Sequence, residues 1–126
     1  MKTIREIIDL IDRQKPNAYE DGDKLQWLTK LDKTIFDELI TTHEGGPETF
    51  ADYTEADMTH EPLGDDVDMY VKWLGAQIDY ANQEISRYNN AMIMFNMLYN
   101  DYANRYNRTH MPKGTHYKNL RWDVMR

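Results

Sequence analysis

Apolar residues recur at helical spacing in four stretches of this chain. In the first stretch, Ile4, Ile7, Ile8 and Ile11 are three or four positions apart, which places them on one face of a helix. The same period continues through three longer stretches. The pattern predicts an all-α fold, a small bundle of about four helices that span residues 3–14, 23–42, 66–82 and 84–108.

Residues that cap or break helices support these boundaries. Pro16 ends the first helix, because the residue before a proline disfavours the α region. The pair Asn82-Gln83 separates the last two helices, although one unbroken helix over 66–108 is the alternative. The candidate N-terminal caps are Thr3 with Glu6, Asp21 or Asp23, and Asp65 or Asp66. We therefore expect residues 1–108 to form a single helical domain.

The last predicted helix carries the most regular pattern. Seven residues step by alternating intervals of three and four, which is the spacing of a heptad seam. This seam consists of Ile85, Tyr88, Met92, Phe95, Tyr99, Tyr102 and Tyr106, with a second stripe of Ala91, Met94 and Leu98 beside it. Tyrosine suits both a core and an interface because its ring is apolar and its hydroxyl is polar. The seam is therefore either internal core or a contact with a neighbouring subunit.

A long acidic loop, residues 43–65, joins the second and third helices. Between His43 and Asp68 the chain has nine acidic residues and no Lys or Arg. Loops of this length are uncommon in compact domains and often have a function. The loop is either a solvated surface segment or an acidic interface, and the candidate interface residues are Glu44, Glu48, Asp52, Glu55, Asp57 and Glu61.

The chain changes character after Arg108. Residues 109–126 form a predicted irregular, extended C-terminal segment, the arm, because His110 to Gly114 contains helix breakers and no period follows. Residues 1–104 carry a net charge of −12, whereas residues 105–126 carry +5. This asymmetry indicates that the arm contacts a negatively charged partner. Its candidate contact residues are Lys113, Tyr117, Lys118, Leu120, Arg121 and Trp122.

Residue types that carry catalysis are sparse or unsuitably placed. The absence of cysteine excludes a thiolate nucleophile and thiolate zinc ligands. Ser86 is the only serine, the four histidines lie at helix ends or in irregular segments, and nothing in the pattern indicates a buried acid. We expect no catalytic, metal or cofactor site, and a protein that is not an enzyme. No run of 18 apolar residues is present, so no membrane span is expected.

Several short motifs, spread over residues 3–108, match a known pattern. They are Asp65-Asp66, Tyr70, Asn82-Gln83-Glu84, Arg87-Tyr88-Asn89-Asn90, Phe95-Asn96 and Tyr99, preceded by Pro16-Asn17 and by Lys24-Leu25-Gln26-Trp27-Leu28. In this order they resemble the small head–tail connector proteins, also called adaptor or head-completion proteins, of tailed phages and prophages of Gram-positive bacteria. The acidic loop and the arm match this pattern least.

This resemblance implies a structural subunit of the virion neck, made in the cytoplasm of the bacterial host. Identical subunits, usually twelve, would form a ring under the portal protein and bridge it to neck or tail-completion proteins. Genomic DNA would pass through the ring without specific binding, which fits the acidic body because like charges repel. The contact residues of the basic arm would bind the portal or a neighbouring subunit, and the acidic loop would complement the arm across a subunit interface. The alternative is a small helical adaptor or regulatory protein that binds a single protein partner.

Overall fold

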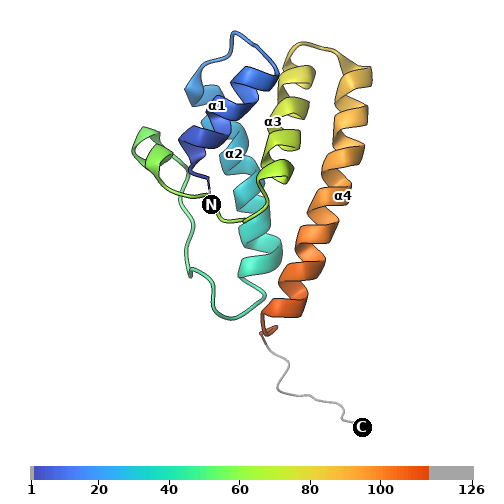
Figure 1. The fold of residues 1–126 in the computed structure, drawn as a ribbon. Helices are drawn as coiled ribbons and strands as arrows, with labels where there is room; N and C mark the ends of the chain where they lie inside the picture. Colours follow the sequence, from blue (N-terminus) through green and yellow to red (C-terminus); the bar gives the residue numbers. More distant parts are fainter. Residues whose placement is uncertain (1, 114–126) are drawn as a thin grey trace.

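The computed structural model describes residues 2–113 and confirms the all-α prediction (Figure 1). The four helices are α1 (Ile4–Gln14), α2 (Asp21–Ile35), α3 (Val67–Ala81) and α4 (Ile85–Thr109). α3 packs against α1, α2 and α4, and α4 lies at the edge of the bundle beside α3. The predicted bounds of the first, third and fourth helices are within one residue of those observed.

α1 begins with the predicted capping box. The Glu6 backbone N–H donates to the Thr3 hydroxyl at 3.2 Å, and the Thr3 N–H donates to the Glu6 carboxylate at 2.9 Å. The isoleucine face of α1 is buried in the common core. Burial of each of these side chains stabilises the fold by about 1.5–3 kcal/mol. Burial of this apolar face keeps α1 folded, because a helix of 11 residues is only marginally stable on its own in water.

α2 differs from the prediction at both ends. It begins at Asp21, after Glu20 as the N-cap, so the predicted cap at Asp21 or Asp23 is wrong. Asp23 acts instead from inside the first turn, where its carboxylate accepts from the Glu20 N–H at 3.3 Å. At the other end the helix widens into a π-helix, Phe36–Ile40, in which the Thr41 N–H donates to the Phe36 carbonyl.

Residues 43–65, called the acidic strap from here on, run along the bundle and are packed against it. A 3₁₀ helix, Glu55–Thr59, lies within the strap and buries Met58. The Ile4 N–H donates to the His60 carbonyl at 2.9 Å, and the Tyr53 N–H donates to the Thr29 hydroxyl at 3.0 Å. These contacts attach the strap to the start of α1 and to α2.

α3 and α4 form an antiparallel pair (Figure 1). The Asp66 carboxylate caps α3 by accepting from the Met69 N–H at 3.3 Å, as predicted. The chain reverses between the two helices, where Gln83 has a φ of 61° in the left-handed region. The alternative of one unbroken helix over 66–108 is therefore wrong.

Gly75 in α3 has room for a side chain. A Cβ at this position would meet the Ile11 Cδ1 at 3.8 Å, which is an ordinary van der Waals contact. We expect Gly75→Ala to raise the free energy of unfolding by about 0.5–1 kcal/mol, because alanine loses less backbone entropy than glycine in a helix. Urea unfolding followed by circular dichroism measures this. Gly45→Ala is the matched control and should destabilise, because Gly45 has a φ of 92°. A Gly75→Ala protein less stable than the parent would contradict the expectation.

Charged side chains are buried between the helices. Lys24 is enclosed, with its Nζ 2.7 Å from the Asp12 carboxylate. Asp79 is also buried and lies 2.9 Å from the Lys15 Nζ. A third buried charge, Asp32, is described below. The expectation that no acid is buried is therefore wrong, because two carboxylates find partners that are distant in sequence.

Candidate functional site

A buried carboxylate joins the acidic strap to two helices. Asp32 of α2 has no exposed surface, and it accepts hydrogen bonds from the hydroxyls of Tyr53 and Tyr70, the latter at 2.5 Å. The Leu63 backbone N–H donates a third bond to it at 3.1 Å. The Tyr70 hydroxyl in turn accepts from the Gly64 N–H at 2.7 Å. This Asp32 cluster connects α2, α3 and two points of the strap.

Burial governs the titration of the Asp32 cluster. Desolvation raises the pKa of Asp32, and the hydrogen bonds from Tyr53, Tyr70 and Leu63 lower it by a smaller amount. Desolvation also raises the pKa of both tyrosines, and the neighbouring Asp32 raises it further. The three donors occupy the carboxylate, and Asp32 has no exposed surface. The arrangement therefore fits a fixed structural contact better than an acid that meets a substrate.

The raised pKa of Asp32 makes stability depend on pH. Its usual value is 3.8, so the folded protein holds this proton over a pH range in which the unfolded chain has lost it. The stability that this group contributes is complete below that value and is lost as the pH rises through the folded pKa. We expect the stability of the parent relative to Asp32→Asn, which does not titrate, to fall as the pH rises above 3.8. Urea unfolding of both proteins at a series of pH values above 3.8 measures this difference in the free energy of unfolding. A difference that stays constant or grows with pH would contradict the expectation.

The sequence contains a signal for this cluster. Asp32 stands four residues after Leu28 and three before Ile35, both buried members of the apolar stripe of α2. A charged residue inside an apolar stripe indicates a buried polar group that needs partners. Nothing in the sequence identifies those partners, because Tyr53 and Tyr70 lie 21 and 38 residues away.

Most predicted acidic interface residues lie on the surface of the strap. Glu44, Glu48, Asp52, Glu55 and Glu61 are all exposed. Asp57 is different, because it caps the 3₁₀ helix: the Thr54 N–H donates to its carboxylate at 2.7 Å and lowers its pKa. The strap thus presents an acidic surface on a backbone that the Asp32 cluster and the contacts to α1 hold in place.

The arm begins beside the start of the strap. The Glu44 N–H donates to the Met111 carbonyl at 2.8 Å, and the Lys113 N–H donates to the Thr42 carbonyl at 2.9 Å. The His43 ring contacts Tyr106 edge-on at 5.2 Å. Lys113 is the one predicted arm contact within residues 2–113, and it is exposed. The other predicted contacts lie outside the described residues: Tyr117, Lys118, Leu120, Arg121 and Trp122.

The tyrosine seam of α4 faces the chain's own bundle. Phe95 and Tyr102 are buried, and Tyr88, Met92, Tyr99 and Tyr106 are half-buried. Ile85, at the start of the seam, is exposed. The Tyr99 hydroxyl donates to the Glu38 carboxylate at 2.5 Å, and burial, followed by this carboxylate, raises the pKa of Tyr99. Near the other end of α4, Arg105 contacts Asp65 and joins the helix to the strap.

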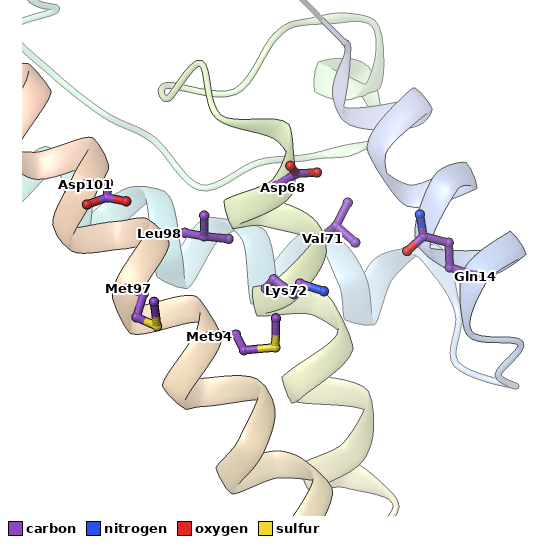
Figure 2. Close-up of a pocket in the computed structure, with 8 residues that line it drawn as sticks. All are labelled: Gln14, Asp68, Val71, Lys72, Met94, Met97, Leu98 and Asp101. Atoms are coloured by element: carbon purple, nitrogen blue, oxygen red, sulfur yellow. The ribbon is translucent and has the colours of Figure 1, made fainter.

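A groove on the other flank of α4 exposes apolar side chains, which include Met94 of the predicted second stripe and two residues, Ile93 and Met97, that the sequence pattern did not single out. Met97 is 65% exposed, Ile93 beside it 61%, and Met94 50%. Ile93 and Met97 are four residues apart and outside the seam, which is the signal that could have identified them. The groove measures about 420 Å³, and its lining residues are shown in Figure 2: Gln14, Asp68, Val71, Lys72, Met94, Met97, Leu98 and Asp101.

Two kinds of site are absent from residues 2–113. No group of three or more His, Asp or Glu side chains in that part of the chain is arranged to hold a metal ion. None of its helices is both long and apolar enough to cross a membrane.

Comparisons with known proteins found no matching family model, no matching curated protein and no matching solved structure. The resemblance to phage connectors therefore stays a hypothesis that rests on the sequence motifs.

Proposed function

We propose that this chain is a structural subunit of a phage head–tail connector, which forms a ring under the portal protein and joins it to neck or tail proteins. The observation that carries the proposal is the position of the arm. Its first residues pair with residues 42–44, where the acidic strap begins. Each subunit thus carries an acidic surface along a helical frame and a basic extension that begins where the strap begins. Two different surfaces on one subunit are what a head-to-tail ring requires.

The charge of the folded part supports a place around a DNA channel. The exposed acids of the strap belong to a body whose net charge over residues 1–104 is −12. DNA is repelled by such a surface, so a ring of these subunits can enclose DNA without binding it. The arm is the part with the opposite charge, and an acidic protein surface is its expected target.

Electron microscopy of portal complexes tests the proposal. The portal protein of the same phage is purified with and without co-expression of this chain, and we expect an additional ring of density on the portal. Lys118→Glu with Arg121→Glu should remove that ring. Lys30→Glu with Lys33→Glu is the matched control, because it changes the charge equally at exposed positions of α2, and it should retain the ring. A portal without added density would contradict the proposal, and one bound copy per complex would favour the single-partner adaptor.

A further inference from the structure

The groove between α3 and α4 has the form of a site for a short peptide segment. Its volume of about 420 Å³ falls within the roughly 300–1,000 Å³ of typical ligand sites. Met94, Met97 and Leu98 line it from α4, and Val71 lines it from α3 (Figure 2). Methionine side chains adapt their shape and are common on surfaces that receive apolar segments of other proteins.

Acidic side chains flank one end of this groove. Asp68, in the first turn of α3, and Asp101, on α4, lie toward the same end, whereas Met94 and Met97 lie toward the other (Figure 2). Lys72 is the single cation among the lining residues, so the two carboxylates give the lining a net charge of −1. The groove therefore suits a segment with apolar or aromatic side chains next to basic ones.

The chain itself contains such a segment. Residues 114–126, the outer part of the arm, include three basic residues and one acidic residue. Within this segment the run Leu120-Arg121-Trp122 places a basic residue between two large apolar ones. We propose that the groove of one subunit binds residues 114–126 of a second copy of this chain. This inference rests on the proposed self-assembly and names the contact that would join neighbouring subunits.

The position of the arm favours a second copy over the subunit's own arm. Tyr99 and Tyr106 of α4 contact Glu38 and His43, and the first residues of the arm pair with residues 42–44 on this same flank. The groove lies on the opposite flank of α4, on the side of α1, where Gln14 contributes to its lining.

The length of the outer arm sets how far it can extend. Its thirteen residues, 114–126, span at most about 45 Å when extended. An arm that leaves one flank of a subunit and a groove that opens on the other flank make a heterologous contact. Contacts of this kind close into a ring when the rotation between subunits allows it.

Disulfide cross-linking tests this contact cleanly, because the chain has no cysteine of its own. Full-length Met97→Cys and Leu120→Cys proteins are purified separately, mixed and oxidised mildly, and the mixed dimer is measured by non-reducing electrophoresis and intact mass. The matched control replaces Met97→Cys with Asn96→Cys, which is also exposed but lines a cavity on the α2 side. We expect the mixed dimer to form about tenfold faster with Met97→Cys, since binding raises the effective concentration of the two thiols.

The double variant, Met97→Cys with Leu120→Cys, separates the two possible donors of the arm. A covalent ladder of two, three and more subunits supports binding to a second copy. A monomer with an internal disulfide would show that the subunit's own arm fills the groove and would overturn the inference, as would equal rates for Met97→Cys and Asn96→Cys. Rings that assemble without this preference would overturn the groove contact alone, whereas a chain that forms neither rings nor cross-links would also contradict the proposed function.

Discussion

Asp32→Ala is expected to lower the free energy of unfolding by about 3–5 kcal/mol, because it leaves three buried donors without an acceptor. Those donors are the hydroxyls of Tyr53 and Tyr70 and the Leu63 N–H. The change also removes the link between α2, α3 and the strap, so the strap backbone should lose hydrogen-exchange protection. Urea unfolding and amide exchange measured by mass spectrometry test both effects.

Asp37→Ala is the matched control for this prediction. Asp37 is exposed in the π-helix that follows α2, and its loss should change the stability by no more than about 0.5 kcal/mol. Tyr53→Phe removes one donor and keeps the ring, so its effect should be about 1 kcal/mol and smaller than that of Asp32→Ala. An Asp32→Ala protein as stable as the Asp37→Ala protein would show that the cluster does not hold the strap.

Removal of residues 114–126 should abolish ring formation and portal docking while the thermal midpoint stays nearly unchanged. The four helices lie within residues 2–113, and Lys113 must be kept because its N–H donates to the Thr42 carbonyl. The deletion removes three basic residues, so it also removes the charge complementarity that the strap and the groove require. Sedimentation velocity measures the assembly, and circular dichroism measures the helix content and the midpoint.

A full-length chain with Lys118, Arg121 and Arg126 all replaced by glutamine separates charge from length. This variant keeps the full length of the arm. If it fails to assemble, as the protein without residues 114–126 should, the loss of charge is the cause. Assembly that survives the deletion of residues 114–126 would show that the arm is not a contact between subunits or with the portal.

The helices could be predicted because local patterns determine them. The isoleucine face of α1, the Thr3 capping box and the Asp66 cap are each encoded within a few residues, and all are present in the structure. The start of α2 was predicted wrongly because two acidic residues competed for a cap that Glu20 occupies. The π-helix Phe36–Ile40 has no recognised sequence signal, since its apolar residues also fit a regular helix.

The contacts that shape the surface could not be predicted, because they join residues distant in sequence. Tyr53 and Asp32 meet across 21 residues, and Arg105 and Asp65 across 40. The seam of α4 showed which residues of the helix are apolar, but only the packing against α3 reveals that Ile93 and Met97 are left outside. The roles of the strap acids and of the arm in assembly stay predictions.

Native mass spectrometry of the full-length chain, alone and with the portal protein, tests the central claim most directly. The account predicts a discrete complex in which several identical subunits, usually twelve in the connectors that this sequence resembles, join the portal. It also predicts that the complex dissociates as the salt concentration rises, because the proposed contacts pair opposite charges. A chain that remains monomeric at every concentration, both alone and with the portal, would contradict it.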